Sequence, residues 1–243
     1  AKRETKITEK VTSRDHSEIM FKNIDVNIIS KDRSIKVSPC DKFSPLNIHI
    51  PADPSTAAFF IGAAVLMPGS KLRVINLLLN DTRIGFLKAL EKMGCSFNYY
   101  NVHEESGEKV GDIEVVHHKL SGININSSDI PSIIDELPML ALIATQAEGV
   151  TKVSGAEELR VKESDRINAI CKNLKEVGSD IVEKSDGFII NGATKLKPGN
   201  IDTFNDHRIA MTFHIASIVS GEKIILNNTD CVDISFPNFY KTL

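Results

Sequence analysis

Three long apolar helices recur along the chain, and their spacing is the feature that most limits the fold. They are predicted at residues 54–67, 135–147 and 207–219, and each is followed by a glycine, at positions 69, 149 and 221. Glycine accepts a positive φ at little cost, so we expect each one to be the C′ residue that ends its helix. Repeated units that bury one face need neighbours, so a repeat by itself predicts packing and does not prove an active site.

Each apolar helix opens a unit of about 70 to 85 residues. A short strand follows each glycine, at residues 71–75, 151–154 and 223–226. Two units continue with an amphipathic helix, 84–93 or 167–177, because apolar residues recur there at spacings of three and four. Two strands then follow, predicted at 95–100 with 112–116 and at 180–183 with 188–191. The unit is a circular permutation of βαβαββ, which predicts a compact, barrel-like α/β domain with pseudo-threefold symmetry.

The first 52 residues carry part of one more unit. A strand is predicted at 5–8, a helix at 13–24 with Ser13 as its N-cap, and a hairpin at 26–38. No apolar helix precedes the first strand, so we expect the chain to begin in mid-unit, in the last part of another domain. The Pro-Ala-Asp-Pro segment at 51–54 breaks regular structure. We therefore predict a partial domain over 1–52 and a second domain over 53–243.

Composition excludes several classes of protein. The 243 residues carry a net charge of −3, so no strong basic field indicates a partner nucleic acid. The longest apolar run, Ala57–Met67, is too short to cross a membrane, and the N-terminus lacks the apolar region of a signal peptide. The four cysteines are far apart and form no CxxC pair, which argues against structural zinc and indicates reduced thiols in a cytoplasmic protein.

The segment from Glu158 to Arg166 places several charges before the helix at 167–177. Ser164 or Asp165 can cap that helix, and Lys162 and Arg166 share a face if the helix starts early. Two cations beside a helix N-terminus would bind phosphate or carboxylate. The alternative is a solvated helix start with ion pairs, although positive side chains at this end oppose the helix dipole.

The segment Asn205-Asp-His-Arg208 opens the third apolar helix. Asn205 or Asp206 can cap the helix, and His207 and Arg208 then lie where an anion would bind. The alternative is a routine cap in which Arg208 pairs with Asp206. Arg14, which also opens a predicted helix, has the same two interpretations: an anion ligand or a surface residue.

Asp135 begins the second apolar helix and is either its N-cap or a general base near the cationic helix ends. Equivalent helix ends converge on one face of a pseudo-threefold domain. That face would collect several helix N-termini, three cations and two carboxylates. The arrangement favours a small, multiply anionic substrate and acid/base chemistry. Two weaker motifs are interpreted structurally: His117-His118 as surface residues, and Asn80 to Arg83 as a turn with a helix cap.

Five motifs together resemble the EPSP synthase (3-phosphoshikimate 1-carboxyvinyltransferase) family. They are Glu158-Leu-Arg-Val-Lys-Glu-Ser-Asp-Arg166, Asn205-Asp-His-Arg-Ile-Ala-Met211, Ile134-Asp-Glu-Leu-Pro138, Asp53-Pro-Ser-Thr-Ala-Ala-Phe59 and Ser13-Arg-Asp-His-Ser-Glu18. The resemblance covers essentially the whole chain. It implies the enolpyruvyl transferase fold of two inverse α/β domains, with helices inside and sheets outside, of which this chain holds the C-terminal domain. Most of the N-terminal domain would be missing, and with it part of the substrate site.

The resemblance also implies a reaction. The family transfers the enolpyruvyl group of phosphoenolpyruvate to the 5-hydroxyl of shikimate 3-phosphate through a tetrahedral intermediate, with release of phosphate and no cofactor or metal. By this resemblance Asp135 is the base and Glu163 the acid. The implied substrate-binding residues are Arg14, Asp135, Glu158, Lys162, Arg166, His207 and Arg208. Guanidinium groups suit the work, because they bind anionic oxygens with two parallel hydrogen bonds.

One position departs from the family pattern and two alternatives stay open. Ile234 stands where some relatives carry a lysine, so any cation at that corner must come from elsewhere or be dispensable. The sister transferase that acts on UDP-N-acetylglucosamine shares the fold. A non-catalytic anion-binding domain would retain it as well. Because half of the shikimate-phosphate site would be missing, we expect the 243-residue chain alone to be inactive.

Overall fold

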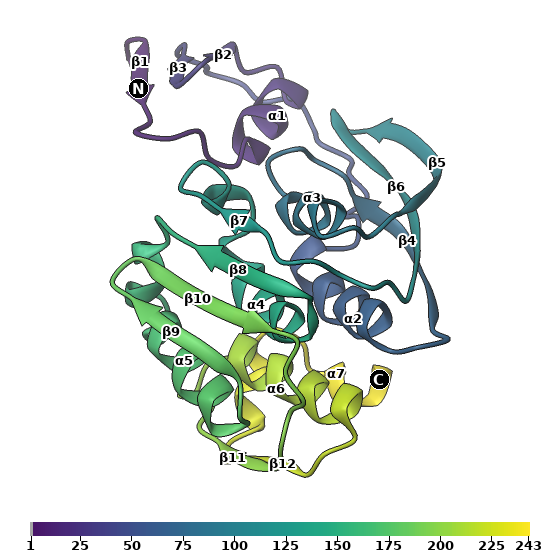
Figure 1. Ribbon diagram of the computed structural model, residues 1–243. Coiled ribbons are helices and arrows are strands. Elements are labelled where there is room, and N and C mark those ends of the chain that lie inside the picture. Colours follow the sequence, from purple (N-terminus) through teal and green to yellow (C-terminus); the bar gives the residue numbers. More distant parts are fainter. Residues whose placement is uncertain (1) are drawn as a thin grey trace.

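The three apolar helices pack against one another at the centre of the molecule (Figure 1). The computed structural model describes residues 2–243, and in it these helices are α2 (Pro54–Leu66), α4 (Leu137–Gln146) and α6 (His207–Ser220). Buried residues occur on all faces of α2 and α4 rather than in one stripe. A helix that is apolar all round is stable only inside a core, which explains the central position.

Sheets lie outside these helices and repeat one topology. The first contains β4 (Lys71–Leu78), β6 (Glu108–Val116) and β5 (Asn98–Glu105), in the order β4-β6-β5. The second has the order β7-β8-β10-β9, from Asn124–Ile125, Gly149–Val153, Gly187–Gly192 and Asp180–Lys184. In the third, β11 (Gly199–Ile201) pairs in parallel with β12 (Ile224–Leu226). A parallel bridge from Ala52 to Leu77 takes the place of β7 in the first sheet. The predicted repeat of βαβαββ units is therefore confirmed.

The amphipathic helices flank this core. They are α3 (Gly85–Lys92) and α5 (Arg166–Glu176), and α5 packs on β9, β10 and β11. Both helices end as predicted at glycines with positive φ, Gly94 at 103° and Gly178 at 87°. Short 3-10 helices complete the units at Ile130–Ser132 (η1), Ile134–Glu136 (η2), Glu157–Val161 (η3) and Asp230–Ile234 (η4), and α7 (Phe239–Thr242) ends the chain.

Residues 5–37 form a small sheet with one helix. The sheet has the order β1-β3-β2, from Thr5–Thr8, Ser34–Val37 and Ile28–Lys31, and the helix is α1 (His16–Asn23). The prediction of Ser13 as N-cap is wrong: α1 starts three residues later, and the Ser13 hydroxyl donates to Glu9. Asp15 takes the N-cap position but its carboxylate accepts a hydrogen bond from Asn80 Nδ2 at 2.8 Å. The side chain at the start of α1 therefore contacts a distant segment of the chain instead of capping the helix.

Three predicted details differ in the structure. Only Gly221 ends an apolar helix in the left-handed conformation, because α2 and α4 end in extended residues and their glycines lie two positions later. The strand predicted from residue 95 begins at Asn98. The helix predicted from Asp135 begins at Leu137, after the 3-10 turn η2, with Pro138 in its first turn.

No helix within residues 2–243 is both long enough and apolar enough to span a bilayer. The division at residue 52 stays a prediction.

Candidate active site

The carboxylate of Asp135 lies among three arginines from separate parts of the chain. Arg14 Nη2 is 2.7 Å from Asp135 Oδ2, Arg166 Nη1 is 3.5 Å from Oδ1, and Arg208 Nη2 is 3.7 Å from Oδ2. Asp135 is not the N-cap of α4, since that position belongs to Glu136 and no side chain caps it. Asp135 instead lies in the turn η2, and its side chain contacts arginines at the N-terminal ends of α5 and α6. The structure therefore brings together the helix ends that the repeat predicted to converge.

These arginines set the protonation of Asp135. Burial raises the pKa of its carboxyl group, but Arg208, Arg14 and Arg166 outweigh burial and lower the pKa to about 2. The carboxylate is thus ionised at neutral pH. Its negative charge is compensated by these arginines, and guanidinium groups are also suited to binding the oxygens of an anionic ligand.

We expect this carboxylate to make folding sensitive to acid. The lowered pKa stabilises the folded chain above the unfolded value of 3.8, and this contribution disappears as the pH falls towards 2. The free energy of unfolding of wild type should exceed that of Asp135→Asn by about 2 kcal/mol at neutral pH. Urea titrations at several pH values should show the difference shrinking below about pH 4. A difference that stays constant down to the acid transition would contradict the ion pairs.

Arg166 is fully buried at the start of α5, where it is held by two carboxylates. Its Nε donates to Asp206 Oδ2 at 2.7 Å, and its Nη2 contacts Glu163 at 2.5 Å. Asp206 is also fully buried and accepts a hydrogen bond from the hydroxyl of Ser164 at 3.0 Å. Burial raises the pKa of Asp206, but Arg166 outweighs burial and lowers it. The two charges fix the orientation of the guanidinium, whose Nη1 then reaches Asp135.

Arg208 and His207 open α6 beside the same carboxylate. Asp206 caps the helix, because its Oδ1 accepts from the Arg208 backbone N–H at 2.9 Å. The Arg208 side chain does not pair with Asp206 but reaches the Asp135 backbone oxygen at 3.3 Å, and its buried Nε has no hydrogen-bond partner within residues 2–243. A small hollow of about 120 Å³ lies here, bordered by His207, Arg208 and Ser235. Burial and Arg208 lower the pKa of His207, so that its imidazole is neutral at pH 7.

Lys162 and Glu158 line a second hollow together with Arg14 and Asp135. Its volume is about 300 Å³, and Ser13 also borders it. Lys162 and Arg166 do not share a helix face, because the early helix start that this required does not occur: α5 begins at Arg166 and Lys162 is extended. Lys162 Nζ pairs with Glu158 Oε1 at 2.6 Å instead. Asp165 is the N-cap of α5, because its carboxylate accepts a hydrogen bond from the Asn168 N–H.

Three buried polar residues next to the site escaped prediction. The turn expected at Asn80 is present, with its Oδ1 accepting from the Thr82 N–H. Arg83, however, points inward and is only 8% exposed, with Nη2 at 2.5 Å from Asp53 and at 3.0 Å from Ser55 Oγ. Ser55 donates in turn to Glu136, which is also buried. A glutamate directly before an apolar helix was the one signal that could have indicated this network.

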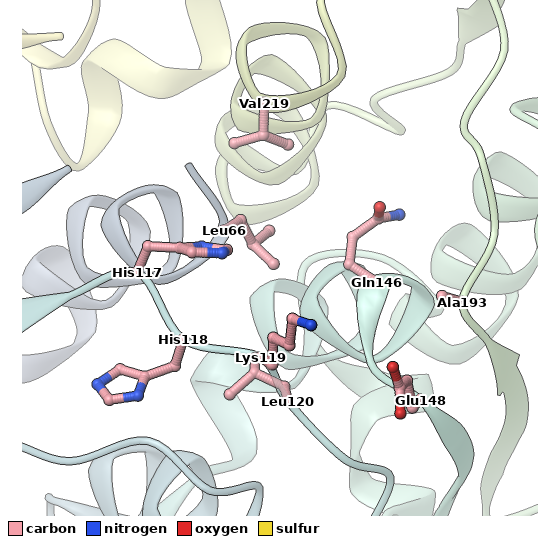
Figure 2. Close-up of a pocket in the computed structure, with 9 residues that line it drawn as sticks. All are labelled: Leu66, His117, His118, Lys119, Leu120, Gln146, Glu148, Ala193 and Val219. Atoms are coloured by element: carbon pink, nitrogen blue, oxygen red, sulfur yellow. The ribbon is translucent and has the colours of Figure 1, made fainter. Parts of the chain in front are cut away.

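A third hollow lies at the opposite ends of the central helices. Figure 2 shows Leu66, Gln146 and Val219, from the last turns of α2, α4 and α6, around it. Its volume is about 270 Å³. His117, expected at the surface, is half-buried here because its Nδ1 lies 2.8 Å from the Val65 carbonyl oxygen. The arginines and Asp135 lie at the other ends of the helices, so this hollow is separate from the site.

Comparison with known proteins yields one family. The model of the EPSP synthase (3-phosphoshikimate 1-carboxyvinyltransferase) family matches residues 1–243. The chain is 47% identical over its full length to a protein of Persephonella marina named 3-phosphoshikimate 1-carboxyvinyltransferase, and 45% identical to one of Sulfurihydrogenibium sp. of the same name. The chain spans 57% of the length of each of these relatives.

Solved structures give the same result. An EPSP synthase of Acinetobacter baumannii superposes with a TM-score of 0.91 at 35% identity, over 99% of this chain and 56% of that one. The enolpyruvyl transferase NikO of Streptomyces tendae superposes with a TM-score of 0.75 at 14% identity, over 99% of this chain and 55% of that one, and shares the fold. The predicted fold class, the enolpyruvyl transferase type, is confirmed.

Proposed function

The chain belongs to the EPSP synthase (3-phosphoshikimate 1-carboxyvinyltransferase) family, and we propose that it forms the C-terminal part of a longer enzyme of this activity. The full-length protein would transfer the enolpyruvyl group of phosphoenolpyruvate to the 5-hydroxyl of shikimate 3-phosphate and release phosphate. The observation that carries this proposal is the ionised Asp135 carboxylate among Arg14, Arg166 and Arg208. Such a site suits two substrates that are both anionic and react by proton transfer.

In this proposal the arginines bind phosphoenolpyruvate. Arg166 is oriented by Asp206, and Arg208 has a free Nε beside the small hollow that Ser235 borders. Both can offer parallel N–H groups to carboxylate or phosphate oxygens. The neutral His207 borders the same hollow. Ile234 stands where some relatives carry a lysine, and Arg208 supplies a cation to the hollow that the next residue, Ser235, borders.

Asp135 is proposed as the base that takes the proton of the 5-hydroxyl. A carboxylate with a pKa of about 2 is a weak base, so the proposal requires that substrates change its surroundings. Anionic substrate groups that pair with Arg14, Arg166 and Arg208 would weaken the effect of these cations on Asp135 and so raise the pKa of its carboxyl group. Arg14 is proposed to bind the shikimate phosphate. It makes the shortest of the three contacts to Asp135, so its ion pair with Asp135 must break when the phosphate binds.

Glu163 is proposed as the acid that protonates the methylene carbon of phosphoenolpyruvate. Its carboxylate is held by Arg166, and about half of its side chain is exposed. A substrate anion that binds Arg166 would release Glu163 to pick up a proton from solvent. Lys162, paired with Glu158 at the border of the neighbouring hollow, is proposed to contact both substrates, and Glu158 is proposed as a further substrate-binding residue.

The remainder of the full-length protein is proposed as the partner of residues 1–50. Large apolar side chains are exposed along this segment, and we propose that the rest of the protein covers them. They are Ile7, Val11, Met20, Phe21, Ile29, Phe43, Ile48 and Ile50. The proposal places the protein in the cytoplasm, which agrees with four cysteines that form no disulfide within residues 2–243.

Phosphate release by the full-length protein tests this function. We expect turnover with phosphoenolpyruvate and shikimate 3-phosphate, and none with UDP-N-acetylglucosamine as acceptor. Arg208→Ala should lower kcat/KM by at least a hundredfold, because a bound charge loses its partner. The control Arg73→Ala removes an arginine from the outer strand β4, where it pairs with Asp112, and should leave kcat/KM unchanged. Binding without turnover would indicate a non-catalytic anion-binding domain, and turnover only with the UDP sugar would indicate the sister transferase.

A further inference from the structure

Glu136 is a buried carboxyl group next to the proposed base, and none of the roles above uses it. Its side chain is only 2% exposed, and its hydrogen-bond partner is the hydroxyl of Ser55 on α2. No lysine, arginine or histidine of residues 2–243 forms an ion pair with it, in contrast to Asp135, which has three. An ionised carboxylate in such a place would be costly, because a single hydroxyl cannot replace its hydration.

The charged groups that face Glu136 come from three elements. Arg208 on α6 and Arg83 before α3 favour its ionised form, and the neighbouring Asp135 carboxylate opposes it. Burial is the largest influence and raises the pKa of Glu136 above its usual range. Two adjacent carboxyl groups oppose each other's ionisation, so the one with fewer cationic contacts is the one that more readily keeps its proton. Asp135 makes the direct contacts to arginine and therefore takes the ionised form.

Glu136 is also the end of a chain of hydrogen bonds. Asp53 caps α2 through the Thr56 N–H at 2.9 Å and holds Arg83, and Arg83 Nη2 donates to Ser55 Oγ at 3.0 Å. Ser55 then donates to Glu136. This chain joins the start of α2 to the turn η2, which carries both Glu136 and Asp135. The hydrogen bond from Ser55 to Glu136 therefore ties the turn that carries Asp135 to the start of α2.

We propose that Glu136 carries its proton at neutral pH and, through Ser55 and Arg83, is a positioning residue that holds the turn η2 so that Asp135 faces the arginines. The proposal rests on the proposed function in one respect, the role of Asp135 as the base. A neutral Glu136 leaves Arg208 free for Asp135 and for the substrate. An ionised Glu136 would compete for Arg208 and draw it away from the site.

Infrared spectroscopy of the 243-residue chain at neutral pH tests the protonation, with no need of activity. We expect a carbonyl band of a protonated carboxylic acid that disappears in Glu136→Gln. The matched control is Glu148→Gln, because Glu148 is an exposed glutamate at the opposite ends of the helices, and this variant should keep the band. Absence of the band in the wild-type chain, or its persistence in Glu136→Gln, would overturn the proposal.

Kinetics of the full-length protein tests the positioning role. Glu136→Ala should lower kcat at least tenfold with a smaller change in KM, and Glu136→Gln should restore most of it, because the amide keeps the size and neutrality of the acid. The pH dependence of kcat should be the same for wild type and Glu136→Gln. Equal losses in Glu136→Gln and Glu136→Ala, with both variants folded by circular dichroism, would overturn the proposal. If the wild-type protein has no activity, the proposed function fails, and the infrared band still decides the protonation.

Discussion

Asp135→Asn is expected to lower kcat of the full-length protein by roughly 10² to 10⁴-fold, the usual contribution of a positioned general base. The asparagine keeps the shape of the side chain and one oxygen for Arg14, but it cannot accept the proton of the substrate hydroxyl. Phosphoenolpyruvate should still bind, since Arg166 and Arg208 are unchanged. Phosphate release under saturating substrates measures the effect, and calorimetry measures the binding.

The control for this change is Asp129→Asn. Asp129 pairs with Lys92 near the start of η1 and lies outside the group of arginines. It has the same side chain and occupies the N-cap position of the neighbouring 3-10 turn, so the control shows whether any loss of a carboxylate in this region slows turnover. A kcat of Asp135→Asn within a few fold of wild type would remove Asp135 from the role of base.

Arg166→Ala is expected to destabilise the 243-residue chain by about 3–5 kcal/mol, because it leaves the fully buried Asp206 carboxylate without its partner. Denaturant titration at neutral pH measures this change. Arg73→Ala breaks an ion pair between β4 and Asp112 on β6, in which the arginine side chain is half-exposed, and should cost at most about 1 kcal/mol. Removal of both charges, in Arg166→Ala with Asp206→Ala, should cost less than the sum of the single changes.

The same substitution separates structure from function. If Arg166 only stabilised the fold, Arg166→Ala would bind phosphoenolpyruvate normally whenever it remained folded. The proposed function requires that binding is lost even at temperatures where the variant is folded. A loss of stability below 1 kcal/mol would contradict the buried ion pair with Asp206.

Much of the fold could be predicted because the strongest patterns are local. Long helices made mostly of apolar residues are stable only when other elements surround them, and the repeats place the first turns of the three helices at equivalent positions. The same repeat, which also includes the amphipathic helix that starts at Arg166, brought Asp135, Arg166 and Arg208 to one place. The ends of α3 and α5 were also predictable, since Gly94 and Gly178 adopt the positive φ that terminates a helix.

Contacts between distant segments account for the errors. Ser13 was a good local N-cap, but the junction between α1 and the turn at Asn80 uses Asp15 instead. Lys162 could share a face with Arg166 only if the helix started early, and α5 starts at Arg166. No local pattern distinguishes a buried arginine in a turn from an exposed one, so Arg83 and its link to Glu136 appear only in three dimensions. The same holds for Asp206, whose role as an internal counterion depends on a residue 40 positions away.

The pKa of the Asp135 carboxyl group, measured by carbon NMR in the 243-residue chain, tests the central arrangement most directly. We predict a value of about 2 in wild type and a rise towards the ordinary 3.8 when Arg14 and Arg208 are both replaced by alanine. A wild-type value near 3.8, unchanged in the double variant, would show that the arginines of the separate repeats do not surround this carboxylate.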